Sequence, residues 1–86
     1  MPGSASAPSL TVYSRSYCHL CDEMLAALRP LQARHGFELR VIDVDSDPQL
    51  EARYGELVPV LTHGERELCH YRLDAAVLTA YLAEIS

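Results

Sequence analysis

Residues 10–21 read LTVYSRSYCHLC, and this stretch predicts the start of the fold. Its first four residues are branched or aromatic and favour a short β-strand. Polar residues follow, and two cysteines, Cys18 and Cys21, then stand three positions apart. A C-x-x-C pair directly after a strand is typical of redox or metal chemistry.

The cysteine pair opens a predicted helix over about residues 17–34. Pro30 lies inside this helix and lacks a backbone donor, so we expect a kink or a weakened last turn there. Gly36 is expected to end the helix. The apolar positions repeat at helical spacing, and they are Cys21, Met24, Leu25, Leu28 and Leu31.

The segment after this helix predicts a second strand and a short second helix. Residues 37–44 read FELRVIDV, and their apolar residues occupy both faces toward the end, which favours a strand that becomes more buried along its length. Asp47 can cap a helix and Pro48 fits its first position. This helix is expected to run through about Tyr54 and to stop at Gly55.

The last third of the chain predicts a hairpin and a final helix. Strands are expected at 58–61 and 67–71, joined by a turn at 63–65. Asp74 is expected to cap the final helix. One apolar face of that helix carries five residues, which are Val77, Leu78, Tyr81, Leu82 and Ile85.

These elements predict an α/β fold of order β-α-β-α-β-β-α. The first two strands are joined through a helix and should be parallel, whereas the last two should be antiparallel. The result is a four-stranded mixed sheet flanked by helices on both faces. Residues 10–86 form the single domain, and residues 1–9 are interpreted as a flexible N-terminal tail.

Composition narrows the classes of partner. The 86 residues carry a formal net charge of −5, with no cluster of Lys or Arg, which argues against nucleic acid or an anionic membrane as the main partner. No apolar run approaches the ~20 residues of a membrane helix. Residues 1–9 lack the features of a secretory signal. The cytoplasm is therefore the default expectation for its location, and a monomer is expected.

The spacing of the two cysteines suits reversible disulfide chemistry. Three residues along a helix rise ~4.5 Å, which places the two α-carbons within the ~4.4–6.8 Å that a disulfide requires. Cys21 lies deeper in the helix, on the side of the apolar residues. A substrate should therefore meet Cys18 first, and Cys21 should resolve the mixed disulfide.

The start of a helix also favours a thiolate at Cys18. Free N–H groups and the positive end of the helix dipole lower the pKa of a thiol placed there. Protonated His19 and Arg15 would add to this effect. Asp22 and Glu23 oppose it, because they bring negative charge close to the sulfur.

A zinc site is the alternative chemistry for the pair. Cys18 and Cys21 are good zinc ligands, but a second C-x-x-C or an H-x-x-x-H is absent. Only Cys69 and His70, on a predicted strand, could complete four ligands. We therefore expect no metal.

The remaining cysteine and the aromatic residues are interpreted mainly as packing residues. Cys69 is expected to behave as a small hydrophobe. Tyr54 is expected to pack, and Tyr17 either packs or flanks the mouth of the site. Three histidines without an identifiable partner are expected in loops or on the surface, namely His35, His63 and His70.

From residue 10 to residue 85, the chain resembles the thioredoxin/glutaredoxin superfamily. The resemblance rests on LTVYS at 10–14, CHLC at 18–21 and VPVL at 58–61. It is strongest to small bacterial glutaredoxin-like proteins, and it implies the thioredoxin-like fold.

The resemblance also implies roles for individual residues. Cys18 would be the nucleophile and Cys21 the resolving thiol. Val58-Pro59 would be a cis peptide facing the pair, with the Val58 backbone pairing with an extended substrate. Arg15 occupies a position where glutaredoxins often carry a basic residue that meets a glutathione carboxylate.

Two departures separate the chain from ordinary glutaredoxins. The Gly-Gly pair and the Asp that usually hold glutathione are replaced by CHYRLD at 69–74, where only Asp74 survives as a binding candidate. The dipeptide between the cysteines is His-Leu. Glutathione is therefore expected to be a weak ligand, although it stays a candidate co-substrate, and no tightly bound cofactor is expected.

The predicted function is thiol–disulfide exchange on protein or low-molecular-weight disulfides, in cell redox homeostasis. A thioredoxin-type or glutathione reducing system would regenerate the dithiol. The alternative is a binding module of the same fold, which uses the Val58-Pro59 edge for a partner and carries a regulatory or vestigial cysteine pair.

Overall fold

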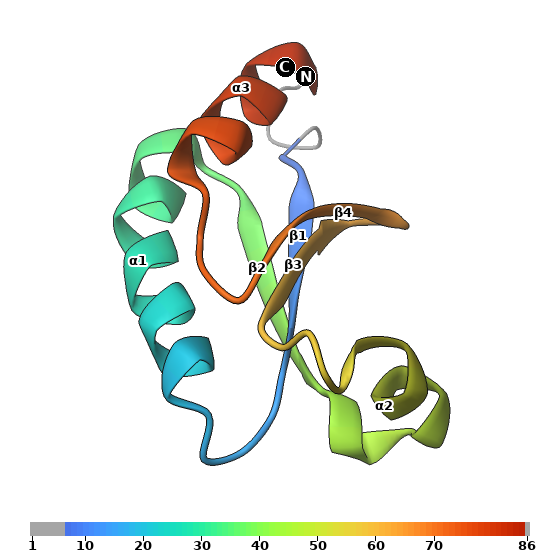
Figure 1. Cartoon of the computed structure of the whole chain (residues 1–86). Helices are drawn as coiled ribbons and strands as arrows, with labels where there is room; N and C mark the ends of the chain where they lie inside the picture. Colours follow the sequence, from blue (N-terminus) through green and yellow to red (C-terminus); the bar gives the residue numbers. More distant parts are fainter. Residues whose placement is uncertain (1–6, 86) are drawn as a thin grey trace.

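The computed structural model describes residues 7–85, and it has the predicted order of elements. Figure 1 shows a twisted sheet between helices. The elements, in chain order, are β1 (Ser9–Ser14), α1 (His19–His35), β2 (Glu38–Asp43), the 3-10 helix η2 (Val44–Ser46), α2 (Pro48–Tyr54), β3 (Val60–His63), β4 (Arg66–His70) and α3 (Ala75–Ile85).

The four strands form one mixed sheet in the order β2-β1-β3-β4. β1 runs parallel to β2 and antiparallel to β3, and β3 and β4 form an antiparallel hairpin. Val12 stands opposite Leu61, and Tyr13 stands opposite Val60. The end of β1, which leads to the cysteines, therefore lies beside the start of β3.

Two hydrophobic clusters occupy the two faces of the sheet. The larger one joins β1 and β3 to α1 and α3, and its fully buried members are Leu10, Val12, Leu28, Leu61 and Leu78. The smaller one joins Val60 to Val44 and to Tyr54 of α2. Tyr54 stacks on Tyr13, with ring centroids 4.2 Å apart. Helices thus cover both faces, as predicted.

Local signals explain where the helices begin and end. The Asp47 carboxylate accepts the Gln49 N–H at 2.8 Å, and Pro48 is the first residue of α2. The Asp74 carboxylate accepts the Val77 N–H at 3.1 Å. Gly36 ends α1 with a φ of 76°, a left-handed conformation that glycine adopts without a steric penalty.

α1 begins at His19, two residues after the expected start, and it continues through Pro30 to His35, so the turn after the proline is still helical. The helix was expected to end at about residue 34, and it includes one further residue, His35. Cys18 lies just before the first helical residue, as its N-cap.

Several details of the strands differ from the prediction. β2 does not become more buried along its length, because it is an edge strand and Val41 is 49% exposed. β3 begins at Val60, so Val58 and Pro59 precede the ladder. β4 runs from Arg66 to His70, so it begins and ends one residue earlier than the predicted strand at 67–71.

The ends of the domain also differ from expectation. β1 begins at Ser9, and the Pro8 carbonyl accepts the Glu38 N–H at 2.8 Å, so these two residues are not part of a loose tail. Residues 1–6 of the predicted tail lie outside the described residues. On α3, Val77 and Ile85 are more than 40% exposed, so the predicted apolar face is narrower than five residues.

None of the helices in the described part of the chain is long and apolar enough to cross a membrane.

Candidate active site

The two cysteines meet at the N-terminus of α1, where their sulfur atoms are joined as a disulfide. Their α-carbons are 5.2 Å apart, within the range expected from the spacing. Cys21 is 2% exposed and belongs to the buried side of α1, whereas Cys18 is half-buried. Cys18 is therefore the sulfur that a second molecule can approach.

The backbone at the helix start points a donor at Cys18. The Cys21 N–H donates to Cys18 Sγ at 3.1 Å, and the Asp22 N–H donates to the Cys18 carbonyl at 3.1 Å. Cys18 has extended backbone angles, φ −110° and ψ 106°, as a helix-capping residue does. The same N–H group would stabilise a negative charge on this sulfur after reduction.

The Val58-Pro59 peptide bond is cis, as the resemblance implied. Pro59 is buried, and its carbonyl accepts the Tyr71 N–H at 2.9 Å. Val58 packs against the cluster of Val44, Tyr54 and Val60. No hydrogen bond joins the Val58 backbone to another residue of the described range 7–85.

Two tyrosines near the site have left-handed backbones. Tyr17, with φ 59°, directly precedes Cys18 and is fully exposed, so it does not pack in the core. Tyr71, with φ 66°, follows β4, and its hydroxyl donates to the Glu56 carbonyl at 3.1 Å. Non-glycine residues with a left-handed backbone conformation are uncommon and cluster at functional sites.

Arg15 is engaged with acidic residues of η2 and α2. Its guanidinium donates twice to Asp45 at 3.1 Å, once to Glu51 at 3.0 Å and once to the Gly55 carbonyl at 3.2 Å. Hydrogen bonds to Asp45 and then Glu51 raise the pKa of this guanidinium. These hydrogen bonds connect the loop after β1 to α2. The role of Arg15 toward the thiolate or a ligand stays a prediction.

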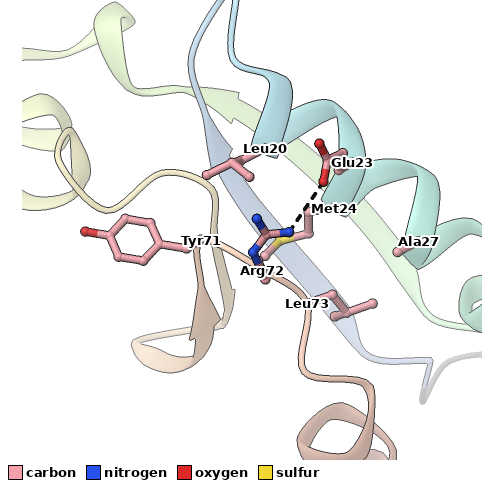
Figure 2. A pocket seen from close by; sticks show the side chains of 7 residues that line it. All are labelled: Leu20, Glu23, Met24, Ala27, Tyr71, Arg72 and Leu73. Atoms are coloured by element: carbon pink, nitrogen blue, oxygen red, sulfur yellow. Dashed lines mark ion pairs between the residues drawn. The ribbon is translucent and has the colours of Figure 1, made fainter.

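An open pocket of about 250 Å³ lies beside the start of α1. One wall comes from α1 and the other from the segment after β4 (Figure 2). An ion pair between Arg72 and Glu23, 3.7 Å apart, crosses it. The lining residues are Leu20, Glu23, Met24, Ala27, Tyr71, Arg72 and Leu73.

The other predicted site residues have simple surroundings. His19 is exposed at the first position of α1, and the Asp74 carboxylate caps α3. Cys69 packs against the larger cluster, as predicted, and burial raises the pKa of its thiol. Residues 7–85 contain no group of three or more His, Cys, Asp or Glu that could hold a metal ion.

Some contacts had no signal in the sequence. Arg15 meets Asp45 and Glu51 across 30 and 36 positions. His63, for which no partner was predicted, bonds through Nδ1 to the Tyr81 hydroxyl. Pairs this far apart become visible only when the sheet brings their elements together.

The sequence profile described as "Glutaredoxin-like domain (DUF836)" matches residues 9–83. The chain belongs to this glutaredoxin-like family. The match includes the cysteine pair, the cis peptide and both walls of the pocket.

Bacterial relatives share nearly the whole chain. The solution structure of protein Ne2328 from Nitrosomonas europaea is 46% identical, with a TM-score of 0.81, over 94% of this chain and 98% of that one. The "Uncharacterized protein Rv0508" of Mycobacterium tuberculosis is 30% identical over 91% of this chain and 86% of its own length.

More distant structures establish the fold. Thioredoxin 1 of Thermosipho africanus is 19% identical, with a TM-score of 0.60 over 88% of this chain and 96% of that one. Glutaredoxin C1 of Populus tremula x tremuloides is 21% identical, with a TM-score of 0.57 over 96% and 90%. The glutaredoxin-like chain therefore has the thioredoxin-like fold.

Proposed function

We propose that this glutaredoxin-like protein is a thiol–disulfide oxidoreductase whose redox couple is Cys18 and Cys21. The observation that carries the proposal is the placement of the two sulfurs. One is half-buried at a helix N-terminus and accepts an N–H, and the other is buried one turn later within bonding distance. A purely structural pair would need no such difference in exposure.

The exchange proceeds in two steps. The Cys18 thiolate attacks one sulfur of a substrate disulfide, so that a Cys18–substrate bond forms, the substrate S–S bond breaks, and the departing thiolate takes a proton from water. Cys21 then loses its proton and attacks Cys18 Sγ, which releases the second substrate thiol. Two electrons pass to the substrate, and the pair becomes the disulfide.

Neighbouring residues support these steps. The Cys21 N–H stabilises negative charge on the Cys18 thiolate before it attacks the substrate disulfide. The Val58 backbone is free to pair with an extended substrate segment, and Tyr17 offers an exposed ring beside Cys18. Regeneration of the dithiol needs a thiol reductant, either glutathione or a protein dithiol of the thioredoxin type.

A redox titration separates this function from a binding module of the same fold. The protein is equilibrated with dithiothreitol buffers of graded ratio, and the oxidised fraction is measured by alkylation and mass spectrometry. Exchange predicts a reversible two-electron transition together with catalysed reduction of a small disulfide. A pair that stays in one state, or that cycles without catalysis, would support the module instead.

A further inference from the structure

We infer that the pocket between α1 and the segment after β4 binds an apolar side chain of a peptide substrate, about two residues from the substrate cysteine. This inference rests on the proposed exchange at Cys18. It assigns the substrate class as polypeptide disulfides with an apolar residue near the cysteine.

The lining of the pocket favours an apolar occupant. Leu20, Met24, Ala27 and Leu73 contribute apolar atoms, and Figure 2 shows them around the same space. The two charged residues, Glu23 and Arg72, pair with each other across it. Because these charges compensate one another, the pocket presents neither sign unpaired to a ligand.

The pocket begins on α1 two residues after Cys18. Leu20 lies inside the C-x-x-C motif, and the opposite wall is tied to the cis peptide through the hydrogen bond from the Tyr71 N–H to the Pro59 carbonyl. A peptide joined to Cys18 and paired along Val58 would therefore lie next to both walls, because Leu20 follows Cys18 and Tyr71 is bonded to Pro59. Both walls are held in place before substrate arrives.

The dimensions fix which substrate residue enters. A helix rises ~1.5 Å per residue, so the pocket extends from ~3 Å at Leu20 to ~13.5 Å at Ala27, measured along α1 from Cys18. An extended peptide advances ~3.3 Å per residue and directs alternate side chains to one face. In a peptide that runs from Cys18 along α1 toward Ala27, the residue two positions from the substrate cysteine reaches ~7 Å, between Leu20 and Ala27.

Two neighbouring alanines provide a matched pair of variants. Both are exposed on α1, but Ala27 lines the pocket and Ala26 does not. Ala27→Phe places a ring in the pocket, whereas Ala26→Phe places the same ring elsewhere on the same helix. Circular dichroism and thermal unfolding show whether both variants fold.

The test measures the second-order rate at which peptide disulfides oxidise the reduced protein. Homodimers of one short, end-blocked peptide carry either Leu or Gly two positions from the cysteine. Each rate is divided by the rate of the same variant with bis(2-hydroxyethyl) disulfide, which is too small to span Cys18 and the pocket. This ratio removes differences in the intrinsic reactivity of Cys18.

For the unmodified protein and for Ala26→Phe, we expect the Leu peptide to react about tenfold faster than the Gly peptide, a difference of ~1.4 kcal/mol. For Ala27→Phe, the two peptides should react at nearly equal rates. Equal rates in the unmodified protein, or equal losses in both variants, would overturn the inference. Failure of the small disulfide to react at all would instead overturn the proposed function, and this inference with it.

Discussion

The capping role of Cys18 predicts that two inactive variants differ in stability. In the structure Cys18 Sγ accepts the Cys21 N–H at the start of α1, as a serine hydroxyl does at many N-caps. Cys18→Ser keeps a capping oxygen, whereas Cys18→Ala leaves this N–H without a side-chain acceptor. Both variants remove the nucleophile, so both should lose exchange activity.

The size of the difference follows from the cap and from the size of the domain. Loss of an N-cap acceptor costs about 1 kcal/mol. Because α1 carries buried Cys21, Met24 and Leu28, weakening its first turn should affect the cooperative unfolding of the whole domain. For a domain of this size, ~1 kcal/mol shifts the unfolding temperature by ~4–8 °C.

The measurement is thermal unfolding followed by circular dichroism at pH 7, with reductant present to keep the remaining thiols reduced. Cys18→Ser should unfold ~4–8 °C above Cys18→Ala. Ser16→Ala changes an exposed residue of the same loop and should leave the unfolding temperature unchanged. Equal unfolding temperatures for the two Cys18 variants would refute the capping role, and with it the source of thiolate stabilisation.

Three further predictions concern Arg15, the buried titratable groups and glutathione. Arg15→Gln should lower the unfolding temperature, because it removes the bonds to Asp45 and Glu51. The exchange rate with a small disulfide should stay within a factor of about three, since the guanidinium binds these exposed acidic groups. A larger loss of rate would place Arg15 in the site. Burial raises the pKa of both Cys69 and Tyr54, so the free energy of unfolding, measured by urea titration, should fall above about pH 8.5. Cys69→Ala should reduce that fall. The same pH profile in Cys69→Ala would contradict a contribution from this thiol. Glutathione should release a Cys21→Ser mixed disulfide more slowly than a small dithiol protein does, and a clear preference for glutathione that is lost in Arg15→Ala would overturn this.

The order of elements was predictable because local signals agree with one another. The strand before the cysteines, the Asp47-Pro48 start of α2 and the Asp74 cap of α3 each act within a few residues, and all three are present in the structure. The position of the cysteine pair at the start of α1 followed from the same signals. The sequence therefore predicted the element that positions the chemistry.

Burial was harder to predict than element type. The apolar run of β2 suggested increasing burial, but strand order is a property of the whole sheet, and β2 lies at its edge. The start of β3 was placed two residues early, because VPVL reads as one strand whereas the ladder begins at Val60.

The sequence showed the residues of the pocket separately but did not predict that they form one pocket. Glu23 and Arg72 were each noted in the sequence, one as an acid near the thiolate and the other in the segment that departs from glutaredoxins. Their contact across the pocket depends on how the segment after β4 turns at Tyr71, and no local pattern specifies that turn.

The most direct test of the central claim asks which sulfur holds the substrate. Cys21→Ser and Cys18→Ser, each with Cys69→Ala, are reduced and mixed with a peptide disulfide, and the products are mapped by mass spectrometry. We expect Cys21→Ser to accumulate a one-to-one mixed disulfide on Cys18 and Cys18→Ser to accumulate none. Accumulation on Cys21 in the Cys18→Ser protein, or no adduct in either, would contradict Cys18 as the attacking thiol.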